Sequence, residues 1–371
     1  MSHATIIAAQ RTAVVPRNGA FRHLEAHQLA APVICALLAD SGIEAGEIDE
    51  VILGNALYGG GNPARMAALA AGLPERVPAL TVDTQCCSGL DAIMLAASRI
   101  RAGEADAIIA GGVESFSRSP LRAVRPGGPD EEPRLYDRPP FTPWDDRDPD
   151  MIEAAAMLAR ELGITRDEQE AFAVESHRKA MEALPTGEIV SLEGLPADAF
   201  KRRLGAAMCR RLPLIAGTKE HGLTPATVAV EADAAAAVLV VSERFATSGL
   251  RIIGSLRVGG DPESPGVAPV EAARRLLHRL DLGAGHIVSA EIMEAFAVQA
   301  MACVRGTGLR EEAVNRGGGA LSRGHPIGAS GAILAVRLVH ELAGAENGTA
   351  GLAAIAAAGG LGSALVVTST S

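Results

Sequence analysis

The chain alternates short apolar runs with longer amphipathic stretches, which is the pattern of α/β layers. This pattern predicts buried strands at residues 51–54, 107–110 and 231–241, the second of which closes on Gly111-Gly112. Between the first two strands, residues 89–102 are rich in Ala and Leu and have the period of a helix. The chain is therefore predicted to be an α/β protein in which helices pack against buried strands.

Residues 117–144 differ in composition from the segments around them. Seven prolines in this stretch disfavour regular structure. The residues that follow, 150–184, have the pattern of one or two exposed helices, and Thr165 with Glu168 forms a capping-box signature for the start of the second. We interpret residues 118–221 as a subdomain inserted between strands of the first core.

A weak internal repeat indicates two related halves. In the first half, Ser88-Gly89 opens an Ala-rich helix, and the strand after it closes on Gly111-Gly112. In the second half, Ser330-Gly331 opens an Ala-rich helix, and the apolar run 352–358 closes on Gly359-Gly360. Duplication and a chance likeness between two Ala- and Gly-rich stretches explain this repeat equally well.

Composition and charge restrict the function. Apolar residues are 48% of the 371 and charged residues 21%, so the chain has material for a large core and little for disorder. Aromatic residues are only 3%, so that core must be aliphatic. The 44 acidic residues exceed the 34 Lys and Arg residues, which argues against nucleic-acid or anionic-membrane partners. Without a signal peptide, a membrane-spanning run or a metal-binding cysteine pattern, we expect a cytoplasmic protein with free thiols and no metal.

The strongest local signal for chemistry is the run Cys86-Cys87-Ser88-Gly89 at a predicted helix start. The free N–H groups and the dipole of a helix N-terminus lower the pKa of a thiol, which makes it a candidate nucleophile. The alternative is a pair of structural thiols, because cysteine is among the residues most often buried.

Two further segments could contribute to a site. His325 stands between Gly324 and Pro326 ahead of a helix, in a glycine-rich stretch that matches no phosphate-loop pattern, and is typical of a positioned base or hydrogen-bond donor. Residues 291–297 are predicted to join a strand to a helix, and taken alone they indicate only the start of an amphipathic helix. The basic runs 201–203 and 210–211 form either a solvated face or a contact for the phosphates of a nucleotide-bearing substrate.

Together these blocks resemble the thiolase family, the cysteine-dependent acyl-CoA acetyltransferases. The family's Cys-x-Ser-Gly motif is matched by residues 86–89, and its Gly-His-Pro-x-Gly-x-Ser-Gly-Ala motif by residues 324–332. Its Asn-Glu-Ala-Phe block is approximated by residues 293–296, and its closing glycine-rich block by residues 359–362. Residues 166–173 are similar to a helix of the family's loop domain. The resemblance covers essentially the whole chain in the right order.

The resemblance implies a thiolase fold, with two duplicated five-stranded cores in α-β-α-β-α layers and an inserted loop domain. The N-terminal core would comprise residues 1–117 and 222–248, the coenzyme A-binding loop subdomain residues 118–221, and the C-terminal core residues 249–371. It also implies a homodimer or a dimer-of-dimers tetramer with a role in lipid metabolism. Coenzyme A thioester would be a co-substrate, and no cofactor would be tightly bound.

The resemblance also implies roles for particular residues. Cys86 would be the nucleophile and His325 the base and oxyanion donor, while Cys87 would be packing. The residues expected to line the site or its oxyanion hole are Met293, Ala356, Ala358 and Gly359, and those expected to bind the pantetheine of coenzyme A are Met151, Thr227, Ala295 and Phe296.

The sequence departs from the family at groups needed for carbon–carbon chemistry. Ala356 stands where the family has a second cysteine that moves the α-proton, and Met293 replaces the Asn that holds an oxyanion-hole water. The loop-domain pair His-Met becomes Asp150-Met151, and the coenzyme A loop around residues 224–227 is altered. We therefore expect an acyltransferase of the acetyl-CoA C-acetyltransferase family that is weak in Claisen condensation and thiolysis.

Two alternatives stay open. One is acyl transfer or hydrolysis without any carbon–carbon chemistry. The other is a degenerate thiolase that serves as a structural partner subunit. The intact motifs around Cys86 and His325 favour an active enzyme over the inert subunit.

Overall fold

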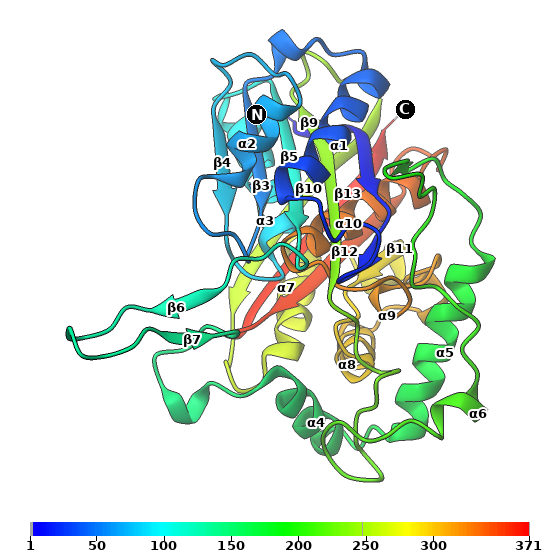
Figure 1. Cartoon of the computed structure of the whole chain (residues 1–371). Helices are drawn as coiled ribbons and strands as arrows, with labels where there is room; N and C mark the ends of the chain where they lie inside the picture. Colours follow the sequence, from blue (N-terminus) through cyan, green and yellow to red (C-terminus); the bar gives the residue numbers. More distant parts are fainter. Residues whose placement is uncertain (1–2, 247, 371) are drawn as a thin grey trace.

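One mixed β-sheet, built by both halves of the chain, lies at the centre of the molecule (Figure 1). The computed structural model describes residues 3–246 and 248–370. The strand order is β11-β12-β13-β10-β1-β9-β5-β3-β4, and the pairing of Thr5 on β1 with Arg251 on β10 joins the two halves. The strands are β1 (Thr5–Thr12), β3 (Glu50–Gly54), β4 (Ala79–Val82), β5 (Ala107–Glu114), β9 (Ala232–Val241), β10 (Gly249–Gly259), β11 (Ile287–Ile292), β12 (Ala350–Ala357) and β13 (Leu361–Thr370), with the short β2 (Val15–Pro16) on β9 and β8 (Ile189–Val190) on β1.

The two halves of the sheet repeat one arrangement. In the first half, β5, β3 and β4 are parallel, and β9 is antiparallel to both β5 and β1. In the second half, β12 and β11 are parallel, and β13 is antiparallel to both β12 and β10. A single bridge between Ala290 and Val314 stands in the place of β4, so the second half has four strands and a bridge among the described residues, not five strands. The repeat in the sequence is therefore a duplication of the fold.

Three apolar clusters fill the spaces between the layers. The central cluster packs α3 (Ser88–Ala102) and α10 (Ile327–Glu341) against strands of both halves. A second cluster packs α1 (Ala26–Ser41) and α2 (Pro63–Ala70) on the outer face of the first half. A third packs α7 (Ala268–Arg279) and α8 (Ala297–Thr307) on the outer face of the second half. This is the expected α-β-α-β-α layering, and its side chains are mostly aliphatic, with Phe21 buried in the second cluster.

The segment between β5 and β9 lies beside these layers (Figure 1). It contains α4 (Met151–Glu161), α5 (Arg166–Glu182) and α6 (Ala206–Cys209). The capping box before α5 is confirmed, because the Glu168 amide donates to Thr165 Oγ1 and the Thr165 amide donates to the Glu168 carboxylate. None of the described helices is long and apolar enough to cross a membrane.

The proline-rich stretch is more regular than its composition indicates. β6 (Arg122–Val124) and β7 (Arg134–Tyr136) pair antiparallel in a hairpin that extends away from the body of the molecule (Figure 1). The expectation of irregular structure was wrong for these residues because the prolines flank the two strands and do not interrupt them.

The strand predicted at residues 107–110 continues through Gly111-Gly112 to Glu114. The two glycines pair with Ala237 and Ala236 of β9 and do not end the strand. Their role is steric, because a Cβ on Gly112 would overlap the backbone carbonyl of Gly328 at the start of α10. Gly112 therefore lets β5 and α10 approach closely, whereas a Cβ on Gly111 would meet Ala236 and Ala237 of β9.

Replacing Gly112 with Ala should destabilise the fold by about 3 kcal/mol, the upper end of the usual cost of overpacking, because backbone meets backbone there. Thermal unfolding followed by circular dichroism measures the change. Gly128→Ala is the matched control, since a Cβ on Gly128 meets no atom within 4 Å. Equal melting temperatures for the two variants would contradict this account of the close approach.

Candidate active site

Cys86 and His325 meet where the two central helices begin. Cys86 stands two residues before α3 and His325 two residues before α10, so the duplicated halves place one reactive side chain each at equivalent points. The Cys86 Sγ lies 3.2 Å from the His325 Nε2. The structure thus brings together the two residues that the sequence predicts as nucleophile and base.

Ser330 contacts the Nδ1 of His325, and this contact favours one tautomer of the imidazole. The Ser330 hydroxyl donates its only hydrogen to the carbonyl of Pro326, at 3.0 Å. With that hydrogen on the Pro326 carbonyl, the hydroxyl can accept from an Nδ1–H of His325, at 2.6 Å. The lone pair of the neutral imidazole is then on Nε2, which faces the Cys86 thiol and can accept its proton.

Burial keeps both members of this pair neutral. It raises the pKa of the Cys86 thiol to about 12, and the nearby carboxylate of Glu114 adds to the increase. It lowers the pKa of His325 to about 4. The direction for Cys86 is opposite to the one expected from a helix start, because burial raises the pKa of the thiol by more than the backbone amide of Cys86 lowers it.

The turn that presents Cys86 is held by short-range hydrogen bonds. Gln85 adopts a left-handed backbone conformation with φ of 55°, which is uncommon for a residue with a side chain. The Ser88 hydroxyl donates to the Gln85 carbonyl at 2.5 Å and accepts from the Thr84 amide at 2.9 Å. These bonds keep the turn in its strained conformation, with Cys86 directed toward His325.

Glu114 is a buried carboxyl group that sequence reasoning missed. It is 1% exposed, at the end of β5, and accepts hydrogen bonds from the amides of Ala56, Leu57 and Gly328 and from the side chain of Asn55. Burial raises its pKa to about 7. Because Gly328 lies in the first turn of α10, Glu114 anchors the helix that follows His325. The only signal in the sequence is an acidic residue directly after an apolar strand.

A cavity of about 210 Å³ opens beside the Cys86–His325 pair. Seven residues predicted for the site line it, namely Cys86, His325, Met151, Ala295, Phe296, Ala356 and Ala358. The sequence reasoning missed other lining residues, including Gln85, Phe141, Leu158, Ser264, Pro265 and Gln299. None of the described lining residues except Cys86 and His325 is ionisable, and no group of His, Cys, Asp or Glu in the described part of the chain is arranged to hold a metal ion. The cavity can therefore support a thiol nucleophile and one base.

Three residues predicted for the site lie outside this cavity. Met293 is 1% exposed and packs in the central apolar cluster. Thr227 is fully buried, and its hydroxyl donates to the Thr224 carbonyl within a turn. Gly359, with φ of 76°, turns the chain after β12 and faces the backbone of Phe141.

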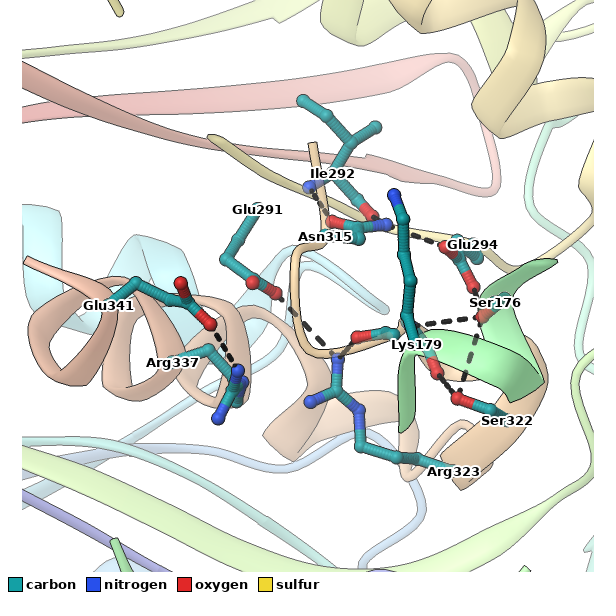
Figure 2. A network of polar contacts seen from close by, with 12 residues as sticks. Ser176, Lys179, Glu291, Ile292, Glu294, Asn315, Ser322, Arg323, Arg337 and Glu341 are labelled. Carbon is teal, nitrogen blue, oxygen red and sulfur yellow. Dashed lines mark hydrogen bonds and ion pairs between the residues drawn. The ribbon is translucent and has the colours of Figure 1, made fainter. Parts of the chain in front are cut away.

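A buried polar network lies beside residues 293–296 and the loop before His325 (Figure 2). The Glu294 carboxylate accepts from Asn315, Ser176 and the Leu321 amide, at 2.7, 2.7 and 3.2 Å. Arg323, the last residue of α9 (Ala320–Arg323), lies 3.7 Å from the buried carboxylate of Glu291 on β11. Glu294 and Arg323 thus tie residues 293–296 and the loop before His325 into one rigid framework.

Comparison with known proteins gives one consistent result. The family model described as thiolase, N-terminal domain, matches residues 4–244, and the model described as thiolase, C-terminal domain, matches residues 247–369. The protein named "Putative acetyl-CoA C-acetyltransferase YhfS" of Bacillus subtilis is 40% identical over 98% of each chain. The VraB protein of Staphylococcus aureus strain MRSA252, which carries the same activity in its name, is 36% identical over 99% of this chain and all of its own.

Two solved structures are similar along the whole chain. The crystal structure of the Bacillus anthracis acetyl-CoA acetyltransferase superposes with a TM-score of 0.91 at 32% identity, over 100% of this chain and 99% of the other. The human mitochondrial 3-ketoacyl-CoA thiolase, crystallised in complex with CoA, superposes with a TM-score of 0.91 at 27% identity, over 100% of this chain and 98% of the other.

The geometry of the pair predicts an unusual pH profile for alkylation of Cys86 by iodoacetamide. With its pKa near 12 the thiol releases no proton to water below about pH 9, and with its pKa near 4 His325 is free to accept that proton above about pH 5. The rate should therefore be level from about pH 5 to 9 and fall below about pH 4, where the imidazole is already protonated.

Replacing His325 with Ala should lower the rate at pH 7 by about 100-fold or more and make it rise with pH. Peptide mapping after limited labelling gives the rate at each cysteine. His340→Ala is the control, because His340 lies at the far end of the helix that follows His325 and contacts the Ala9 carbonyl. A level profile that survives in His325→Ala would exclude the imidazole as the base.

Proposed function

The chain belongs to the thiolase family and is an acyltransferase, and we propose that it takes an acyl group from a coenzyme A thioester onto Cys86 and passes it to an acceptor without efficient carbon–carbon chemistry. One observation carries this proposal. A thiol lies 3.2 Å from an imidazole nitrogen whose tautomer leaves it free to accept a proton, in a cavity that contains no second base among its described residues.

The first half of the reaction follows from this geometry. Cys86 Sγ attacks the thioester carbonyl carbon while His325 Nε2 takes the thiol proton. The bond from the carbonyl carbon to the coenzyme A sulfur then breaks, and the imidazolium returns the proton to the leaving thiolate. The products are the Cys86 acyl-enzyme and free coenzyme A. In the second half an acceptor with a hydroxyl, amine or thiol, or water, attacks the acyl carbon while His325 takes its proton, the bond to Cys86 Sγ breaks, and the imidazolium returns the proton to the thiolate.

The residues that could replace the missing α-carbon base are all turned away from the cavity. Cys87 Sγ donates to the Ile355 carbonyl at 3.5 Å. Cys303 is buried behind Gln299 and donates to the Gly266 carbonyl at 3.4 Å. The Asp150 carboxylate caps α4 through the Ile152 and Glu153 amides. Claisen condensation needs a proton taken from carbon, and among the described residues that line the cavity with Ala356 the only ionisable groups are Cys86 and His325, which supports acyl transfer or hydrolysis as the main activity.

Coenzyme A is the thioester carrier that we assign. A relative of similar fold, the human mitochondrial 3-ketoacyl-CoA thiolase, was crystallised with CoA. We assign the pantetheine to the part of the cavity lined by Met151, Ala295 and Phe296, with Thr227 supporting that wall from within. We assign the phosphates to the inserted segment 118–221, which exposes the basic side chains of Arg203, Arg210 and Arg211.

The assembly and location of the protein belong to the same proposal. We propose a cytoplasmic homodimer, or a dimer of such dimers, that acts in lipid metabolism. The first-half sheet ends at β4, where Leu80 is 40% exposed, and the neighbouring α2 exposes Met66 and Leu69. Apolar side chains along an open sheet edge support pairing with a second copy. The intact Cys86–His325 pair argues against a purely structural subunit.

Incubation with a panel of acyl-CoA thioesters should add the mass of one acyl group to the intact protein. The adduct should map to Cys86, and its formation should be at least about 100-fold slower in His325→Ala, since general-base assistance typically contributes that much or more. Intact-mass spectrometry measures it and reports the preferred chain length. Cys87→Ala is the control and should acylate like the natural protein. An adduct on another cysteine, or none with any thioester, would defeat the proposed function.

Exchange of the acetyl-CoA methyl protons in heavy water should be negligible with the natural protein, because no second base adjoins the acyl group. Replacing Ala356 with Cys should raise the exchange rate by about tenfold or more, since positioned proton transfer contributes at least that much. Ala358→Cys, which also lines the cavity, is the matched control and should stay slow. Mass spectrometry of the recovered acetyl-CoA measures deuterium uptake. Rapid exchange in the natural protein would show an additional base and restore full thiolase chemistry.

A further inference from the structure

Asp91, on α3, carries a buried carboxylate that no step of the proposed reaction uses. The residue is 5% exposed and accepts three hydrogen bonds. Thr84 Oγ1 donates to its Oδ2 at 2.7 Å, Arg257 Nη1 donates to the same oxygen at 2.9 Å, and Ser363 Oγ donates to its Oδ1 at 2.7 Å. A carboxylate that accepts from three donors, one of them charged, holds those donors strongly and in a specific geometry.

The three donors come from both halves of the molecule. Thr84 belongs to the turn that presents Cys86, two residues later in the chain. Arg257 lies on β10 and Ser363 on β13, both in the half that also carries His325. Asp91 therefore connects the turn of the nucleophile to the half of the molecule that supplies the base.

We propose that Asp91 is a positioning residue for the nucleophile, which holds Thr84 and thereby sets the distance from Cys86 to His325. This inference rests on the proposed role of Cys86 as nucleophile. Asp91 itself touches no reacting atom, because it acts through Thr84.

The hydrogen bonds around Thr84 show how such a connection reaches Cys86. The Thr84 amide donates to the Ser88 hydroxyl, and the Thr84 carbonyl accepts from the Cys87 amide at 3.2 Å. A shift of Thr84 would therefore disturb both bonds that shape the turn on either side of Cys86. Gln85 lies between these two bonds in a strained backbone conformation, so the turn should relax when Thr84 loses its bond to Asp91.

Removing the carboxylate charge should leave the protein folded. The side chain of Arg257 is 50% exposed, so it can be solvated when Asp91 is replaced. Asn at position 91 keeps the shape and can still accept one hydrogen bond. Thr84→Val removes only the bond between the turn and the carboxylate, and it leaves the bonds from Arg257 and Ser363 in place.

The test measures the alkylation rate of Cys86 by iodoacetamide across pH in Asp91→Asn, Thr84→Val and the double variant. In each single variant the alkylation rate of Cys86 at neutral pH should fall about tenfold, because misplacement of reacting groups by about 1 Å lowers a rate by about 10- to 100-fold. The profile should change from level to rising with pH, since a thiol that has lost its imidazole must ionise to water. The double variant should be no slower than the slower single variant, because both changes remove the same connection.

Asp106→Asn is the matched control. Asp106 also accepts from one serine hydroxyl, Ser242 at 2.6 Å, and one arginine, Arg244 at 3.2 Å. It precedes β5 at the end opposite Glu114, roughly 26 Å along the strand at about 3.3 Å per residue. The control should keep the natural rate and the level profile even where its melting temperature falls, which separates positioning from general destabilisation.

A natural profile in Thr84→Val would overturn the inference, and so would a double variant whose loss equals the product of the two single losses. If Asp91→Asn fails to fold, Thr84→Val alone decides. Failure of the proposed function looks different, because the natural protein itself would then show no acylation by acyl-CoA and no level alkylation profile.

Discussion

The two central helices, α3 and α10, approach so closely that backbone meets backbone, and the rest of the site depends on this contact. A Cβ on Gly89 would lie 2.7 Å from the Gly328 carbonyl, and a Cβ on Gly331 would lie 2.6 Å from the Leu90 amide. Only glycine permits such an approach. Because each helix is preceded by one reactive residue, their contact brings Cys86 and His325 together. The duplicated halves thus create a site that neither half contains alone.

The second determinant of the chemistry is the partial burial of this pair. Burial disfavours both the thiolate and the imidazolium, so the resting pair is neutral and Cys86 reacts as His325 takes its proton. The thiol becomes nucleophilic when a carbonyl carbon is close enough for attack and proton transfer to occur together. Ser330 makes this transfer directional by holding the imidazole with its lone pair toward sulfur. The fold therefore couples reactivity to occupation of the cavity.

The departures from the family motifs affect one half of the chemistry only. Acyl transfer to Cys86 needs a thiol, a base and an apolar cavity, and all three are present. Chemistry at the α-carbon also needs a second base and a stabilised enolate oxygen, and these are the groups replaced by Ala356 and Met293. Met293 packs in the core, so the replacement of the family's Asn by Met removes a polar group from the site and adds no other. The two changes are consistent with each other and with a narrower reaction.

The sequence by itself determined that the chain is an α/β protein and predicted Cys86 and His325 as candidate nucleophile and base, because hydrophobic period and short motifs are local properties of the chain. It left duplication and a chance likeness equally open, and the sheet topology decided for duplication. It also led to seven residues of the cavity through a resemblance that the comparisons confirm at the level of family and fold. It could not determine the direction of the Cys86 pKa shift, since the burial of Cys86 against the central apolar cluster depends on distant segments. Only the tertiary structure decided the contacts of Glu114 and Asp91, whose partners Gly328 and Ser363 lie 214 and 272 residues away in the chain. Desolvation and hydrogen bonding between remote segments leave no periodic signal in a sequence, and this is the physical reason why those contacts required the folded molecule.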